Sequence, residues 1–217
     1  MKILFLILAI LIFIPACQQT NNTPPNPYAA HTMGEDPVKM VFDEGAAQFV
    51  EVNYREVTEE ALEHLRNLYI SDEDTQRWFI RYYIENFEED KGLTVQEMAA
   101  FARDRAEFET AWREYASAEY GVEVTEEEID AQIDYNVEAY GNTLPPAVQG
   151  ISNGLNISYE EYMREFDRDY AERTVIWQQL MPVLLEKHYM EESERLDGVF
   201  LGQAYEEEVK AYLEGNP

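Results

Sequence analysis

Apart from carboxylates, this chain has few residues able to do acid–base, nucleophilic or metal chemistry. Its 217 residues include three histidines, His31, His64 and His188, and one cysteine, Cys17. None of these lies in a metal-binding or nucleophile motif, and no glycine-rich phosphate-binding loop is present. We therefore predict a protein that is not an enzyme, with no catalytic residue, no metal site and no cofactor.

Carboxylates are abundant: 44 Asp and Glu stand against 16 Lys and Arg, giving a net charge of −28. The runs at 72–74, 126–128 and 206–208 coincide with predicted helix starts, where negative charge complements the helix dipole. None has the alternating ligands and central glycine of a calcium-binding loop. A pair of acids meeting across a cleft would suit a hydrolase of the glycosidase type, and this alternative stays open. The net charge excludes nucleic acid as a partner, and also anionic lipid head groups.

Cys17 is the candidate for covalent modification. A charged start is followed by an apolar run at 3–14 that is too short to span a bilayer, which is typical of a signal peptide. Ala16-Cys17 then resembles a lipobox, in which the cysteine becomes the first mature residue and carries the lipid, typically palmitate. The alternative is an ordinary signal peptide followed by a free cysteine.

These features predict three parts of the chain. Residues 1–16 would be a lipoprotein signal peptide, 17–37 a flexible proline-containing tether, and 38–217 one helical domain. Cys17 would anchor the protein to the cell membrane on its extracytoplasmic face.

Capping signals divide the domain into helices. Capping boxes are predicted at Thr94–Glu97, Thr125–Glu128 and Ser158–Glu161, with Gly121 closing the helix before the second box. The helices expected from these signals and from apolar periodicity are 59–69, 72–87, 94–120, 125–140, 159–188 and 203–213. The segment 141–157, with its prolines and glycines, is expected to form no continuous helix, and 196–202 a break. Short alternating segments at 38–42 and 49–52 allow at most a minor two-stranded element, so the predicted fold class is all-α.

Aromatic and methionine residues form a stripe along 159–188. At helical spacing most of them must be core, but those left exposed would make an adaptable apolar binding surface. The peptide-binding candidates are Tyr162, Met163, Tyr170, Trp177 and Met181. Elsewhere Trp112 and Phe166 are expected in the core, and the pairs Arg105–Glu109 and Glu109–Arg113 on the wet face of their helix.

Several of these segments carry a resemblance to a known family. They are V-N-Y-R-E-V-T (52–58), V-E-V-T-E-E-E-I-D-A-Q-I (122–133), Y-E-E-Y-M-R-E-F (159–166), L-L-E-K-H (184–188) and the acidic helix 206–217. Together they resemble the N-terminal chaperone domain of the SurA/PrsA family of extracytoplasmic foldases. The resemblance spans about residues 50–217, and Tyr54 stands where the family prefers glycine.

The resemblance implies a holdase or foldase that binds unfolded, newly exported polypeptides. Members of this family couple such a domain to a parvulin-type prolyl isomerase domain, which is not expected here because the sequence stops at Pro217. An isomerase or another envelope protein is a possible partner. The rival hypothesis is a scaffold lipoprotein that binds one folded envelope protein through a single aromatic patch.

Overall fold

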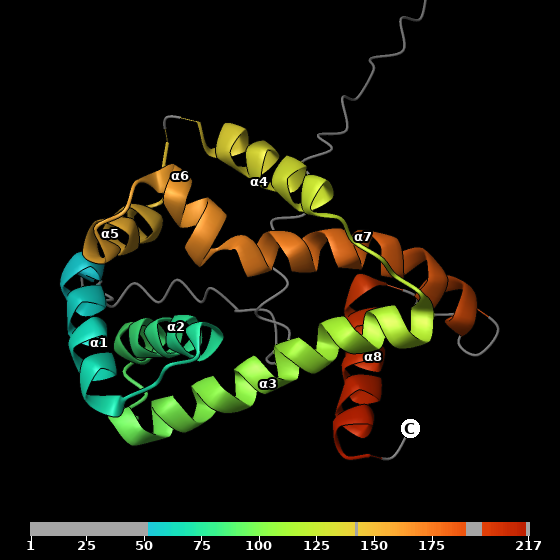
Figure 1. Ribbon diagram of the computed structural model, residues 1–217, viewed down its shortest axis with the longest axis horizontal. Helices are drawn as coiled ribbons and strands as arrows, with labels where there is room; N and C mark the ends of the chain where they lie inside the picture. The colour runs from blue at the N-terminus through green and yellow to red at the C-terminus, as the bar shows by residue number, and fades with distance from the viewer. Residues whose placement is uncertain (1–51, 142, 190–196, 216–217) are drawn as a thin grey trace, which may run out of the picture.

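The computed structural model describes residues 52–141, 143–189 and 197–215, which are helical throughout apart from short connections (Figure 1). The elements are α1 (Tyr54–Leu68), α2 (Glu73–Glu89), α3 (Val95–Tyr120), α4 (Glu126–Tyr140), α5 (Pro146–Leu155), α6 (Tyr159–Glu161), the π-helix η2 (Tyr162–Phe166), α7 (Arg168–His188) and α8 (Gly198–Leu213). No strand occurs in these ranges, which confirms the all-α prediction for them. None of the described helices is both long enough and apolar enough to span a membrane.

Several predicted features lie outside the described residues. They are the signal peptide, Cys17, the tether, and the possible strands at 38–42 and 49–51; Val52 is described and is not in a strand.

The three predicted capping boxes and the glycine that ends α3 are confirmed. Thr94, Thr125 and Ser158 each accept a hydrogen bond from the backbone N–H three residues on, and the glutamate there accepts one from the N-cap backbone. Gly121 closes α3 in the left-handed conformation, with φ of 66°. Cap signals are local, so the sequence alone was sufficient to place them.

The first helix begins earlier than predicted. Asn53, not Thr58, is the N-cap of α1, because the Asn53 side chain accepts a hydrogen bond from the Glu56 backbone N–H. Thr58 is instead fully buried inside the helix, where its hydroxyl donates to the Tyr54 carbonyl at 2.6 Å. The segment 52–58 is therefore mostly the first turn of a helix.

The prediction that 141–157 contains no helix is wrong. Pro145 is the N-cap of α5 and Pro146 its first residue, where a proline costs no hydrogen bond. Gly150 and Gly154 lie one turn apart and let α1 approach closely. A Cβ atom on Gly150 would lie 2.4 Å from Tyr54 Cβ, and one on Gly154 would lie 2.6 Å from Thr58 Cβ.

The predicted helix 159–188 is interrupted. The Asp167 backbone N–H bonds the Tyr162 carbonyl, five residues back, at 2.9 Å, which makes the π-turn η2. The longest helix is therefore α3. Pro182 lies inside α7 without ending it. At the end of the chain, α8 begins at Gly198 and includes Gly202, so the break expected across 196–202 is wrong for residues 198–202.

The buried side chains form two hydrophobic clusters. The first joins α1, α2, α4, α5, η2 and the N-terminal half of α3, with Phe79, Met98 and Ile133 among its most buried members. The second joins the C-terminal half of α3 to α7 and α8, and is centred on Trp112 and Tyr205. Trp112 and Phe166, predicted as core, are 2% and 6% exposed.

The third helix, α3, connects the two ends of the molecule. In Figure 1, α2 packs on the N-terminal half of α3, α1 packs on α2, and α5 packs on α1, while α8 crosses near the C-terminal end of α3 and α4 packs on α7. The N-terminal half of α3 therefore contributes to one cluster and the C-terminal half to the other.

Candidate functional site

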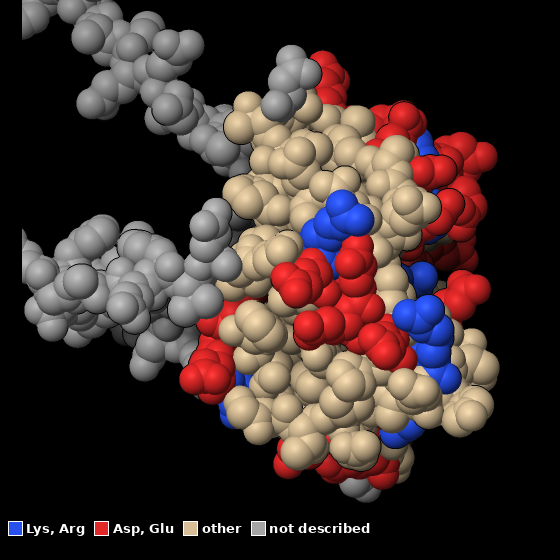
Figure 2. Space-filling view, turned by 90° about the vertical axis from the view of Figure 1, so that its left-hand side faces the viewer, with Lys and Arg blue, Asp and Glu red and all other residues tan. Residues whose placement is uncertain are grey.

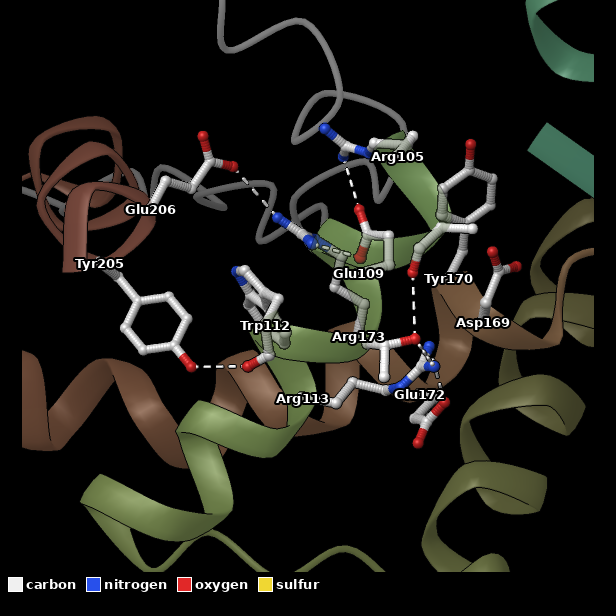
Figure 3. A network of polar contacts seen from close by, with 12 residues as sticks. Arg105, Glu109, Trp112, Arg113, Asp169, Tyr170, Glu172, Arg173, Tyr205 and Glu206 are labelled. Atoms are coloured by element: carbon white, nitrogen blue, oxygen red, sulfur yellow. Dashed lines mark hydrogen bonds and ion pairs between the residues drawn. The ribbon is translucent and has the colours of Figure 1, made fainter. Parts of the chain in front are cut away.

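The described residues offer two candidate functional sites: a network of buried arginines between the helices, and an open groove over the middle of α3. Figure 3 shows the part of the arginine network that surrounds Glu109.

Arg81 anchors the π-turn to α2. Its guanidinium pairs with both oxygens of Asp169, at 2.6 and 2.7 Å, and donates to the Phe166 carbonyl at 2.8 Å. It also lies 4.1 Å from the centre of the Tyr170 ring and 4.7 Å from that of Trp78. Since Tyr170 N–H bonds the Asp167 carbonyl, the Phe166 carbonyl is left to accept from Arg81.

Burial and pairing compete in this cluster. Burial acts to lower the pKa of Arg81, but the interactions with Tyr170 and Asp169 outweigh it and hold that pKa well above its ordinary value. For Asp169, burial acts to raise the pKa, while the charge and hydrogen bonds of Arg81 bring it below the ordinary value. Both groups are therefore held in their charged forms.

Glu109 is the second centre of the network. One of its oxygens meets Arg105 at 2.6 Å and the other meets Arg173 of α7 at 2.6 Å. Arg173 also forms an ion pair with Glu206 of α8 at 3.2 Å, and its guanidinium lies over the ring of Trp112. The Arg105–Glu109 pair thus forms, but not on the wet face, because Glu109 is only 7% exposed.

Arg113 does not take up the predicted pairing with Glu109. It lies 3.7 Å from Asp74 and 3.8 Å from Glu172. Burial raises the pKa of Glu172, and Arg113 opposes that rise.

The network is suited to holding helices together and not to acid–base catalysis. An arginine stays protonated at any physiological pH, and Asp169 and Glu109 each meet a guanidinium within 2.6 Å. Bidentate and aromatic-stacked arginines of this kind fix orientation. We therefore assign this network a positioning role, linking α2, α3, α7 and α8.

The groove over α3 is open to solvent and has a volume of about 450 Å³. Its floor is α3, with Ala106 and Ala111 buried at the bottom and four exposed side chains above them, Arg103, Glu107, Thr110 and Glu114. One wall is the start of α2, at 72–75, and the other is the end of α8. From α8, Tyr212 and Leu213 line the wall while remaining 38% and 41% exposed.

The groove is predominantly acidic at its edges. Four carboxylates line it, from Asp72, Asp74, Glu107 and Glu114, against the single guanidinium of Arg103. Asp72 accepts hydrogen bonds from the Thr75 hydroxyl and backbone, which lower its pKa. A general acid needs the opposite shift, so Asp72 gives the hydrolase alternative no support.

The groove was not predicted from the sequence. The sequence pattern that could have indicated it is a row of polar residues at intervals of four, three and four: Arg103, Glu107, Thr110 and Glu114. Polar residues at this spacing are typical of any solvated helix face. The walls come from α2 and α8, far away in sequence, and no local pattern identifies them.

The predicted peptide-binding residues are placed differently from one another. The expectation that Tyr162 is exposed is wrong: Tyr162 and Met163 are each 3% exposed, because η2 turns them into the first cluster. Tyr170 covers Arg81, while Trp177 and Met181 are partly buried against the second cluster. None of the five lines the α3 groove.

The described histidines have packing roles. His64 lies against the ring of Tyr83 at 5.4 Å between centres, and His188 against Phe200 at 5.6 Å. Within the described ranges, no group of three or more histidine, cysteine or acidic side chains is placed to hold a metal ion.

Acidic side chains do not cover the molecule evenly. Figure 2, which views the side where α1 and α5 lie, shows carboxylates gathered near the middle of that face, with uncharged side chains over much of the rest. Parts of this surface are therefore open to contacts that involve no charge.

Comparison with known proteins gives no relative: no protein-family model, no curated protein and no solved structure matches this chain.

Proposed function

We propose that this protein is a lipid-anchored chaperone domain on the extracytoplasmic face of the cell membrane, which binds unfolded, newly exported polypeptides. The observation that carries the proposal is the open α3 groove, where the partly exposed Tyr212 and Leu213 stand over a floor of alanines. A hollow with apolar side chains at its bottom and along one wall accepts apolar side chains that an unfolded chain exposes. The resemblance to the SurA/PrsA chaperone domain supports the same function.

The mechanism would be transient burial of apolar segments without chemistry. Binding removes apolar area from water, and each segment is released when its chain folds. The net charge of −28 would keep the complex soluble by repulsion between complexes. A proline isomerase activity forms no part of the proposal.

The test uses the full chain carrying Cys17→Ser, which removes the lipid attachment site. At near-stoichiometric ratio it should slow the aggregation of an unfolded apolar client, followed by light scattering. A folded protein of similar acidic net charge is the control, because polyanions can slow aggregation without binding apolar segments. The chain should not accelerate cis–trans exchange of an X-Pro peptide, which is slow enough to follow directly.

Two results would contradict the proposal. Unchanged aggregation, together with tight binding to one folded envelope protein, would favour the scaffold hypothesis. Prolyl isomerisation above background would show that the protein is an enzyme. The anchoring is tested separately: Cys17→Ser should abolish lipid labelling and alter processing, and unchanged labelling with unchanged membrane retention would refute a lipid on Cys17.

A further inference from the structure

The α3 groove has a charge pattern that narrows the kind of polypeptide it would take. Two of its four carboxylates are already engaged: Asp72 caps α2, and Asp74 pairs with Arg77 and Arg113. Glu107 and Glu114 have no ion-pair partner among the described residues, and both are exposed. These two carboxylates are therefore available to a ligand.

Glu107 and Glu114 flank the apolar floor. They lie two helical turns apart on α3, a separation of about 10 Å along the axis. Buried Ala106 and Ala111 form the bottom of the groove beside these two glutamates, and exposed Thr110 lies between the glutamates on α3. Tyr212 and Leu213 line one wall, and Arg103, the one guanidinium of the groove, lies one turn before Glu107. The apolar surface is thus accompanied by these two available carboxylates and by one guanidinium, an excess of negative charge.

The size of the groove limits the occupant further. Its volume of about 450 Å³ falls in the range of small-ligand sites and accommodates a few side chains at most. A folded domain would make contact only across the rim. A short stretch of unfolded chain can place its side chains inside.

We propose that the α3 groove binds polypeptide segments in which a few apolar side chains are flanked by lysine or arginine. This inference rests on the proposed function and adds the class of segment and the residues that select it. The apolar side chains would lie over Ala106 and Ala111, against Tyr212 and Leu213, and the flanking cations would pair with Glu107 and Glu114.

The test measures binding of three labelled peptides by fluorescence anisotropy at low salt, using the full chain with Cys17→Ser. The peptides share one apolar core and differ in their flanks, which carry lysine, serine or glutamate. The lysine-flanked peptide should bind about tenfold more tightly than the glutamate-flanked one, as expected for two exposed ion pairs. Added salt should reduce that ratio.

Two variants and a matched control locate the effect. Glu107→Lys with Glu114→Lys should remove or reverse the preference. The matched control, Glu119→Lys with Glu138→Lys, changes the net charge equally at exposed positions that do not line the groove, and should keep the preference. Thr110→Trp, at an exposed position on the floor, should weaken all three peptides at least about tenfold by filling the groove. Circular dichroism of each variant verifies that the helices are retained.

The outcomes separate this inference from the proposed function. If all peptides bind equally, or if the control variant loses the preference as well, the groove does not select for charge and the inference is overturned while chaperoning stands. If a folded Thr110→Trp variant binds all three peptides as tightly as the parent, the peptides bind outside the α3 groove and the inference is overturned. If no peptide binds and aggregation is unaffected, both proposals fail.

Discussion

Asp169 carries a buried negative charge that depends on Arg81. The two side chains are only 13% and 11% exposed and share two hydrogen bonds. Removing one member of a buried pair leaves the other without compensation, which costs more than the pair contributes. The Arg81 cluster should therefore respond to mutation much more strongly than the ion pairs on the surface.

Asp169→Asn should lower the free energy of unfolding at pH 7 by about 3–5 kcal/mol. The pKa of Asp169 is lowered in the folded protein, so its contribution is present above the unfolded value near pH 4 and is lost as the pH falls through the folded value. The difference between variant and parent should therefore shrink below about pH 4. Urea melts across a pH series measure both effects.

The matched control is Asp130→Asn, since Asp130 is 57% exposed and pairs with Arg168 at 3.1 Å on the surface. That substitution should cost no more than about 1 kcal/mol. Equal losses in the two variants, or a loss at Asp169 that persists unchanged to low pH, would argue against the Arg81 cluster as described.

At the scale of the helices, what sequence could predict depends on how local the cause is. Thr94, Thr125 and Ser158 bond residues only three positions away, so their helix starts were predictable. The helix α5 was not, because Gly150 and Gly154 disfavour a helix unless a second helix packs against them. That second helix, α1, lies about a hundred residues earlier in the chain.

The same distinction applies to side-chain exposure and to the groove. Helical spacing made Tyr162 and Met163 candidates for exposed members of the stripe, but both lie in the π-helix η2 and are buried in the first cluster. The groove depends on α2 and α8 meeting across α3, which no single segment encodes.

Gly150→Ala should destabilise the protein by about 1–3 kcal/mol, although alanine favours helix over glycine by about 1 kcal/mol. The added methyl would meet Tyr54 Cβ at 2.4 Å and the Arg55 backbone nitrogen at 3.2 Å, so α1 has to move. Gly198→Ala in α8 is the control, because nothing lies within 4 Å of its added carbon. Thermal melts should show a loss for the first and none for the second; a stabilised Gly150→Ala would mean that α1 and α5 are not in such close contact.

At the scale of the whole molecule, unbalanced charge opposes folding. A net charge of −28 on a folded chain brings carboxylates closer together than they are in the unfolded one. Most Asp and Glu side chains lie at the surface, where salt screens them, whereas the Arg81 and Glu109 pairs are buried and screened less.

Raising sodium chloride from about 0.01 to 0.1 M shortens the screening distance from roughly 30 to 10 Å. We expect the melting temperature to rise by about 2–4 °C. For a chain of this size, that rise corresponds to a gain of roughly 1 kcal/mol in the free energy of unfolding. Potassium chloride should act equally, because screening depends on ionic strength and not on the cation. A melting temperature that falls with salt would mean that attractive surface pairs outweigh the repulsion.

The positions of Trp78 and Trp112 have a consequence for how unfolding can be observed. Trp78 belongs to the cluster around α2, Trp112 to the cluster around α8, and the third tryptophan, Trp177, lies partly buried against the latter. Single-tryptophan versions of the protein would give each half its own emission signal. Arg105 lies over the ring of Trp78, and Arg173 lies over the ring of Trp112. Glu109 forms ion pairs with both arginines, so the two tryptophans report on the two ends of one ion-pair network. Whether they change at the same denaturant concentration tells directly whether the two halves melt as a single cooperative unit.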